Sequence, residues 1–359
     1  MTLPQEEARD WIGLSLIPGL GGETYRRLLA AFGSPQQIYA ASASHLRQVV
    51  NAEIASAIGT GPHGPLIDQT LAWLEIKGNH LITLGDKNYP QAFLEIPDPP
   101  VLFYAKGNTK LLNAPTIGIV GSRHATPQGL KNAEFFAQAL SETGWCVASG
   151  MALGIDGAAH VGALKGSGST IAVVGTGLDI VYPSRHRELA HQIVEKGVLV
   201  SEYPLSTPSK AHNFPRRNRL ISGLSRGVLV VEANPESGSL ITARLAAEQG
   251  REVFAIPGSI HSPLSKGCHQ LIKQGAKLVD NIHDILDEFS HVMARHEQAF
   301  ETAKAEDTLL SVMGFEVMDS ETLIRLSGLT SDQLSAKLLT LELEGSIASL
   351  PGGRFQRIT

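Results

Sequence analysis

The sequence predicts an α/β protein built around a doubly wound parallel sheet, with a helical domain before the sheet and a winged-helix-like domain after it. Three observations predict this order. Apolar residues recur three and four positions apart near the N-terminus, short apolar runs alternate with helical segments in the middle, and three helices with a hairpin are indicated at the end. A chain of 359 residues is long enough for two or three domains.

Residues 1–84 are expected to form the helical domain. Helical spacing runs from Trp11 to about Ile76 and is interrupted at 17–22 by the sequence Ile-Pro-Gly-Leu-Gly-Gly. Two interpretations of this turn are open. Its glycines resemble those of a helix-hairpin-helix, whose backbone N–H groups approach a phosphate, but a tight turn that only packs two helices uses the same residues.

A Pro-rich connector, residues 85–109, leads to the central domain at 110–289. Near-continuous apolar strands separated by helices are typical of a parallel sheet that is covered on both faces. The predicted strands are 116–120, 147–149, 170–174, 198–201, 227–231 and 252–256. The predicted helices begin near Pro127, Gly154, His186, Pro215, Gly238 and Gly267.

The polar residues 290–306 are expected to form a linker, and the winged-helix-like domain spans 307–359. Its helices are predicted at 307–313, 320–326 and 331–344, before a hairpin around Pro351. The third helix offers one cation, Lys337, in a segment whose residues 305–359 hold four basic and eight acidic side chains. Because duplex binding needs Lys and Arg, we expect this domain to contact a protein.

Charge is distributed unevenly along the chain. The net charge is −5, yet residues 110–226 hold twelve basic and seven acidic residues, so a local basic site is allowed. Cys146 and Cys268 lie far apart and indicate neither a disulfide framework nor a thiolate metal site. The N-terminal segment is acidic and no apolar run reaches the roughly 18 residues of a membrane helix. We therefore expect a cytoplasmic protein with no membrane insertion.

The loops that follow the strands are the candidate site, because ligands of open α/β sheets bind outside the carboxyl ends of the strands. Many of these loops open with glycine or a small polar residue, which lets the backbone approach a phosphate. In the loop at 210–219 four cations flank Phe214, a composition that suits a single strand with a base stacked on the ring. The alternative is a solvated helix start with Phe214 in the core. The candidate DNA-binding residues are Ser122, Arg123, Gly150, Lys210, Phe214, Arg216, Arg217, Asn218, Arg219, Ser237, Gly238 and Ser239.

Other ligands and reactions find less support. The pair Gly175 and Gly177 lacks the third glycine of a dinucleotide fingerprint, and the P-loop pattern is absent. The thirteen histidines are scattered, so neither a metal nor a cofactor is expected. A nucleotide-processing enzyme that uses Glu202 or Glu232 as its acid is the alternative. We favour a protein that is not an enzyme, in which Glu232 accepts hydrogen bonds.

The segments that match a known family are Tyr89-Pro90, Pro99-Pro100, Gly121 to Arg123, Ser149 to Asp156, Ala159-His160, Gly175 to Asp179, Tyr182-Pro183, Phe214 to Arg219, Glu232-Ala233, Ser237 to Ala243 and Ile256 to Gly258. In these segments the chain resembles the DNA processing protein A (DprA/Smf) family over about 89–280. The resemblance implies a Rossmann-like domain, an N-terminal helix-hairpin-helix or SAM-like domain and a C-terminal winged-helix domain. It also implies a homodimer that binds single-stranded DNA, protects incoming DNA in natural transformation (competence) and helps load the RecA recombinase. The same resemblance implies a DNA pocket that is lined by Arg123, Lys210, Phe214 and residues 216–219.

Two positions depart from the family pattern. His186, between Arg185 and Arg187, stands where the family has Asn nearby, and Cys268 with His269 replaces a Thr-Asn pair. The first change is expected to alter the local loop and its charge, and the second to alter a phosphate contact.

Overall fold

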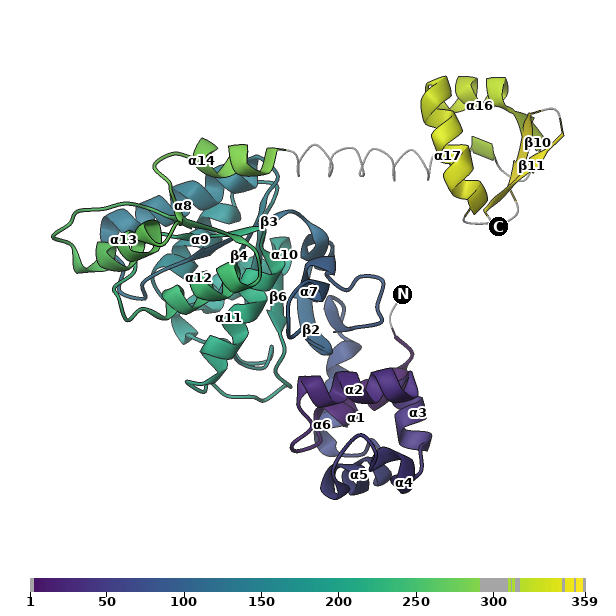
Figure 1. Ribbon diagram of the computed structural model, residues 1–359, viewed down its shortest axis with the longest axis horizontal. Coiled ribbons are helices and arrows are strands. Elements are labelled where there is room, and N and C mark those ends of the chain that lie inside the picture. The colour runs from purple at the N-terminus through teal and green to yellow at the C-terminus, as the bar shows by residue number, and fades with distance from the viewer. Residues whose placement is uncertain are drawn as a thin grey trace. The chain divides into compact units, whose positions relative to one another are not determined.

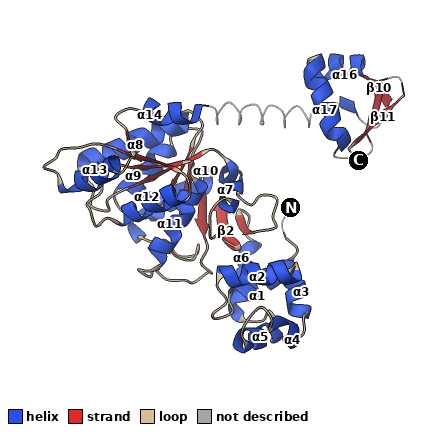
Figure 2. Cartoon of the chain, viewed as in Figure 1, coloured by secondary structure: helices blue, strands red, loops and turns tan. Residues whose placement is uncertain are grey.

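The computed structural model describes residues 3–290, 309–310, 312–313, 317–343, 346–351 and 353–357. The chain divides into two compact units, Met1–Glu288 and Phe289–Thr359. The first unit combines a group of short helices with a large sheet, and the second combines helices with a small sheet (Figure 1, Figure 2).

Six helices open the first unit, and side-chain caps explain where several of them begin. Ser34, Ser42 and Asn51 each accept a hydrogen bond from the backbone N–H three residues ahead. The helices bury Trp11, Tyr25 and other apolar residues in a core that continues into the strands of the sheet. The helices are α1 (Gln5–Ser15), α2 (Gly22–Phe32), α3 (Pro35–Ala40), α4 (Ala43–Leu46), α5 (Ala52–Gly59) and α6 (Pro65–Leu74).

The turn between α1 and α2 contains Gly19 at φ +80°. A carboxylate lies beside the start of α2, because a Cβ added at Gly22 would be 3.7 Å from Oδ1 of Asp98. Asp98 also forms an ion pair with Arg26 at 2.8 Å, and it belongs to the Pro-rich connector. The carboxylate of Asp98 already occupies the space beside the start of α2 that a phosphate would take, so the geometry favours the interpretation as a packing turn.

The sheet has nine strands in the order β1-β2-β6-β5-β4-β3-β7-β8-β9. The six predicted strands correspond to β3–β8, and β3 to β9 run parallel. The parallel sheet predicted from the sequence is present, and β1 and β2 add an antiparallel edge to it. The strands are β1 (Asn79–Thr83), β2 (Leu102–Gly107), β3 (Thr116–Val120), β4 (Cys146–Ser149), β5 (Thr170–Val173), β6 (Val198–Ser201), β7 (Gly227–Val230), β8 (Glu252–Ala255) and β9 (Lys277–Leu278).

Helices cover both faces of this sheet, so its central strands β3–β7 are buried on both sides. Helices α8 (Pro127–Glu142), α9 (Ile155–Ala163) and α10 (Arg187–Lys196) pack together on one face. Helices α11 (Asn213–Leu224), α12 (Gly238–Glu248) and α13 (Lys266–Lys273) share a core on the other face, together with the short α7 (Gln91–Leu94); α14 (His283–Leu286) follows β9.

The order of the strands reverses at β3. The chain proceeds from β3 through β4 and β5 to β6 on one side, and then returns to build β7, β8 and β9 on the other. β3 therefore pairs with both β4 and β7, and the loops that follow β3 and β7 leave the sheet in different directions. Such a switch point is where open α/β sheets form a crevice.

The second unit has a winged-helix arrangement. Its strands β10 (Val317–Asp319), β11 (Ile347–Leu350) and β12 (Arg354–Arg357) pair in the order β10-β12-β11. Helices α16 (Ser320–Ser327) and α17 (Ser331–Leu343) match the second and third predicted helices, and the hairpin is formed by β11 and β12. The core includes Leu309 and Met313 from the first predicted helix. Most of the predicted linker lies outside the described residues.

Candidate nucleic-acid interface

A cavity of about 440 Å³ opens at the carboxyl edge of the sheet, at the switch point between β3 and β7. Loops distant in sequence supply its walls: the loop after β3, the loop after β4, the start of α11 and the start of α12. Eight of the twelve predicted DNA-binding residues line it: Ser122, Arg123, Phe214, Arg217, Asn218, Ser237, Gly238 and Ser239. The predicted convergence of loops is therefore present as a cavity.

The loop that carries Arg123 is held by Glu232. The Glu232 carboxylate accepts hydrogen bonds from Thr126 N at 2.9 Å and Thr126 Oγ1 at 2.6 Å, and its backbone carbonyl accepts one from Ser122 N at 2.7 Å. These bonds join the loop after β3 to the end of β7. Glu232 thus accepts hydrogen bonds, as the sequence suggested, and its carboxylate is occupied at both oxygens.

Phe214 belongs to the cavity wall and has two arginines near its ring. The guanidinium carbon of Arg123 is 5.3 Å from the ring centroid, and that of Arg217 is 6.0 Å away. Phe214 is half-buried, and Gly175 behind it leaves room for the ring, since a Cβ at Gly175 would be 3.2 Å from it. The ring is therefore fixed from behind, while its surroundings include the exposed cation Arg123.

Arg217 is a buried cation that supports the cavity from inside, with only 4% of its surface exposed. Its Nη1 donates hydrogen bonds to the carbonyl oxygens of Gly150 and Val173. Burial lowers the pKa of Arg217 to about 10, while nearby Asp156 favours its charged form. Burial likewise raises the pKa of Asp156, and Arg217 opposes that rise. The pair shapes the loop after β4, and the predicted residue Gly150 belongs to this support because both side chains lie against it.

The remaining cations of the 210–219 loop have two different environments. Arg219 is 9% exposed and donates from Nη2 to both carboxylate oxygens of Glu202, at 2.5 and 2.6 Å. It also pairs with Asp98 of the connector at 3.3 Å. Lys210 and Arg216 are exposed and outside the cavity lining. The structure thus does not bring Arg219 to the cavity: it ties α11 to the connector, whereas Lys210 and Arg216 face solvent near the cavity.

The start of α12 forms the opposite wall. Ser237 caps this helix by accepting a hydrogen bond from Ser239 N at 3.3 Å, and the two hydroxyl oxygens are 2.7 Å apart. A Cβ added at Gly238 would meet nothing within 4 Å, so the space above it is open. The open helix N-terminus and Arg123 in the same cavity lining both favour an anion, and the exposed Glu236 of that lining opposes it.

The predicted DNA-binding residues leave out several residues of the cavity lining, among them Asp156 and Glu236, and also Tyr182, which lies beside the cavity. Asp156 lines the cavity, and its place shortly after the early glycine of the β4 loop was the available signal. Tyr182 stacks against Phe214 with ring centroids 5.7 Å apart. Nothing in the spacing of Tyr182 and Phe214 indicates that contact, because Tyr182 lies in the loop after β5 and Phe214 in the first turn of α11, which follows β6.

The departures from the family pattern have structural roles. Nδ1 of His186 lies 3.0 Å from the carbonyl oxygen of Met151, which fastens the segment before α10 to the loop after β4. Cys268 is buried beneath β7, and Nε2 of His269 lies 3.0 Å from the carbonyl oxygen of Gly258. Within the described residues no group of His, Cys, Asp or Glu is arranged to hold a metal ion.

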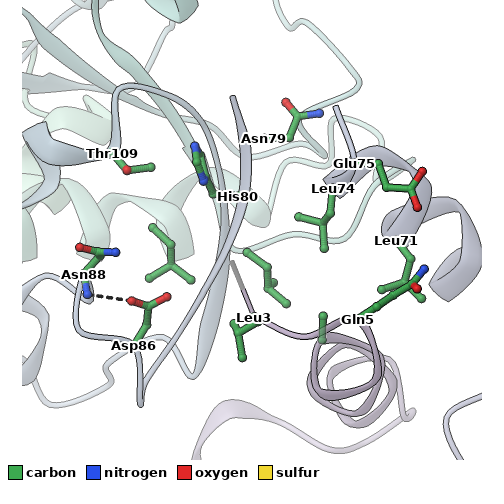
Figure 3. A pocket seen from close by; sticks show the side chains of 13 residues that line it. Leu3, Gln5, Leu71, Leu74, Glu75, Asn79, His80, Asp86, Asn88 and Thr109 are labelled. Carbon is green, nitrogen blue, oxygen red and sulfur yellow. Dashed lines mark hydrogen bonds between the residues drawn. The ribbon is translucent and has the colours of Figure 1, made fainter. Parts of the chain in front are cut away.

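A second hollow, of about 570 Å³, lies between α1, α6 and β1 (Figure 3). Its lining includes Leu3, Leu71 and Leu74, and Asp86 accepts a hydrogen bond from Asn88 N at 2.8 Å. None of the predicted DNA-binding residues contributes to it.

Comparison with known proteins identifies the family. The family model described as "DNA recombination-mediator protein A" matches residues 80–290, and a DprA winged helix domain model matches residues 293–353. The chain belongs to the DNA recombination-mediator protein A (DprA/Smf) family. The resemblance predicted from the motifs, and the α/β fold with a C-terminal winged helix, are thereby confirmed.

Among DprA/Smf relatives, Protein Smf of Escherichia coli is 43% identical over 298 residues, which are 80% of either chain. DNA processing protein DprA of Streptococcus pneumoniae is 52% identical over 205 residues, covering 57% of this chain and 72% of the relative. The crystal structure of S. pneumoniae DprA superimposes with a TM-score of 0.68 at 38% identity, covering 80% of this chain and 99% of that one.

A structure of DNA processing protein A from Helicobacter pylori, described for its single-stranded DNA binding mode, gives a TM-score of 0.54 at 32% identity. It covers 59% of this chain and 96% of that chain. The family thus places the chain among proteins of DNA processing and recombination. Of the helices described, none has the length and apolar character needed to cross a bilayer.

Proposed function

We propose that this protein binds single-stranded DNA in the cavity between β3 and β7. The observation that carries the proposal is Phe214, a half-buried ring with Arg123 over it, set at a topological switch point beside an open helix N-terminus. Arg123, Lys210 and Arg216 are exposed and would contact phosphates, whereas the ring would stack on an unpaired base. Arg217, Arg219 and Gly150 would position these groups.

Similarity to the H. pylori protein, whose structure concerns single-stranded DNA binding, supports the same ligand. We further propose that the protein is a cytoplasmic homodimer that protects incoming DNA during natural transformation and helps load RecA. These finer assignments rest on the family resemblance. They are tested by nuclease protection of oligo-dT, by sedimentation of the free protein, and by RecA filament assembly on the coated strand with and without this protein.

We propose no catalytic role. The two acids that a nucleotide-processing enzyme would use are engaged: Glu202 by Arg219 and Glu232 by Thr126. Release of a free base from nucleoside monophosphates by the purified protein would reverse this conclusion.

For the winged-helix unit we propose a protein partner. Lys337, the cation of the predicted third helix, is buried at 5% exposure, whereas Asp332 and Glu342 are exposed on α17. Leu339 on the same helix is 60% exposed. An acidic and partly apolar helix surface is a poor match for the phosphates of a duplex. Gel-shift titrations of the full chain with a DNA duplex test this assignment. Equal duplex affinity of the unmodified protein and Glu342→Lys would support it, and tighter duplex binding by Glu342→Lys would argue against it.

The DNA-binding proposal is tested by fluorescence anisotropy of labelled oligo-dT over a salt series. The double variant Lys210→Ala/Arg216→Ala is expected to bind more weakly and with a shallower salt dependence. The matched control is Lys196→Ala/Arg226→Ala, which removes one Lys and one Arg, both exposed, from the opposite, amino-terminal edge of the sheet. Equal affinity of both double variants would exclude this site.

A further inference from the structure

A short segment beside the cavity combines aromatic and basic character. Residues 182–187 read Tyr-Pro-Ser-Arg-His-Arg and lead through a 3₁₀ turn, η2 (Ser184–His186), into α10. Tyr182 is 46% exposed, and the side chains of Arg185 and Arg187 are at least partly open to solvent. The cavity between β3 and β7 does not include any of these residues in its lining.

Contacts of Tyr182 and His186 fix this segment next to the cavity. The ring of Tyr182 packs on that of Phe214, with centroids 5.7 Å apart and planes inclined by 38°. On the next turn, Nδ1 of His186 lies 3.0 Å from the carbonyl oxygen of Met151. The His186 ring also lies against α9, because a Cβ at Gly157 would be 2.7 Å from its Cε1 atom. The segment that carries the two arginines is thus anchored to Phe214 of the cavity wall and to the loop after β4.

The charges of this segment are available to a ligand. Among the ion pairs of the described residues, none involves Arg185 or Arg187. The neighbouring Asp179 is engaged by Ser206 N, which donates to both of its carboxylate oxygens at 2.9 Å. Glu188 is an acid at the start of α10 and reduces, without cancelling, the excess of two arginines.

An exposed ring beside a half-buried ring provides a second surface for stacking. Single-strand sites use successive aromatic side chains for successive bases and cations for the intervening phosphates. We propose that Tyr182, Arg185 and Arg187 form a second subsite, which takes a further nucleotide of the strand bound at Phe214. Tyr182 stacks on its base, and the two arginines contact the phosphates that follow. This inference rests on the proposed function of the cavity.

The test compares two lengths of labelled oligo-dT, one of about 4 nucleotides and one of about 16. Tyr182→Leu is expected to lower affinity for the longer strand about tenfold and to leave the shorter strand unaffected. Arg185→Gln/Arg187→Gln is expected to reduce the salt slope for the longer strand by about 1.4, two ionic contacts of a single strand. Tyr182→Phe keeps the stacking face and is expected to bind both strands normally.

Photocrosslinking provides a readout that does not depend on affinity. A long strand that carries 5-iododeoxyuridine is expected to crosslink to the peptide containing Tyr182, and to lose that crosslink in Tyr182→Leu. Thermal unfolding of each variant shows whether its fold is retained.

The outcomes separate the two proposals. If Tyr182→Leu weakens both strands equally, the residue acts through Phe214 and the second subsite is wrong; it is also wrong if neither strand is affected. If Lys210→Ala/Arg216→Ala binds as tightly as the unmodified protein, the cavity itself is wrong. If that double variant loses affinity for oligo-dT as expected, and the changes at Tyr182, Arg185 and Arg187 have no effect, only the second subsite is wrong.

Discussion

Arg217 donates a hydrogen bond from Nη1 to the carbonyl oxygen of Gly150 at 2.6 Å, so a cation of the predicted DNA-binding loop is used inside the protein. Arg219 is likewise committed to Glu202. The four cations of the loop therefore divide into an inner pair, Arg217 and Arg219, and an outer pair, Lys210 and Arg216, that is open to solvent. This division determines which substitutions affect folding and which affect binding.

Arg217→Met is expected to lower the free energy of unfolding by about 3 kcal/mol, because it leaves Asp156 buried without its cation and two carbonyl oxygens without their donor. Urea unfolding measures the loss. Arg216→Met is the matched control, and its effect is expected to stay within about 0.5 kcal/mol because Arg216 is exposed. A fully stable Arg217→Met protein would contradict the supporting role.

The inner and outer arginines also differ in the salt dependence of DNA binding. Arg216→Met is expected to reduce the slope of log affinity against log salt by about 0.7, as for one lost contact with a single strand. Arg219→Met is expected to leave this slope unchanged, because its guanidinium is paired with Glu202 and Asp98. Anisotropy titrations at several salt concentrations measure both slopes. A reduced slope in Arg219→Met would show that Arg219 contacts phosphate after all.

Phe214→Leu is expected to weaken oligo-dT binding about tenfold, since stacking on an aromatic ring contributes roughly 1–3 kcal/mol per base. The salt slope is expected to remain the same, because the change removes no charge. The same anisotropy titrations distinguish this result from the loss of a cation. Unchanged affinity would favour the alternative in which Phe214 is only a core residue.

Gly154 joins the loop after β4 to the loop after β3. It has φ +79°, and a Cβ at this position would overlap the backbone carbonyl oxygen of Ser122. Gly154→Ala is expected to destabilise the protein by about 1–3 kcal/mol and to weaken DNA binding by displacing Arg123. Gly59→Ala is the control, because a Cβ at Gly59 meets nothing within 4 Å. Thermal unfolding and anisotropy titrations compare the two variants. Equal stability and equal DNA affinity of the two would contradict this role.

The buried His160 is expected to make the free energy of unfolding depend on pH. Burial, with His186 and Arg217 nearby, lowers the pKa of His160 from 6.5 to about 3, and its Nδ1 lies 2.7 Å from Thr170 Oγ1. The folded protein therefore keeps His160 neutral, while the unfolded chain takes up a proton below pH 6.5.

This difference is expected to reduce the free energy of unfolding by about 1.4 kcal/mol per pH unit as pH falls from 6.5 toward 3. His160→Gln removes that contribution, so its stability relative to the unmodified protein is expected to improve as pH falls. Urea unfolding at about pH 8 and about pH 5 measures the change. A constant difference between the two proteins would show that His160 does not remain neutral.

The parallel part of the fold was predictable because each strand from β3 to β7 is buried on both faces, as is the second half of β8, and a local apolar run records that burial. β1, β2 and β9 were not predicted. β2 lies in the Pro-rich connector and joins β6 only through long-range antiparallel pairing, and β9 has two residues. Short edge strands leave little periodic signal in a sequence.

The composition of the site was predictable for a related reason. Small residues at strand ends, and cations around Phe214, are local chemical features, and the rule for open sheets places them along one edge. The sequence by itself therefore determined the fold class, the edge of the sheet where the cavity opens and eight of the residues that line it.

Only the tertiary structure decided what each cation does. Lys210, Arg216, Arg217 and Arg219 carry the same charge in the sequence, but burial and partners differ among them. Arg217 and Arg219 donate to carbonyl and carboxylate oxygens of distant segments, 67 positions away for Gly150 and 121 for Asp98. The contact of Tyr182 with Phe214 also depends on such long-range packing. The charge or aromatic ring of a side chain is fixed by the residue type, whereas its burial and its hydrogen-bond and ion-pair partners depend on its place in the fold.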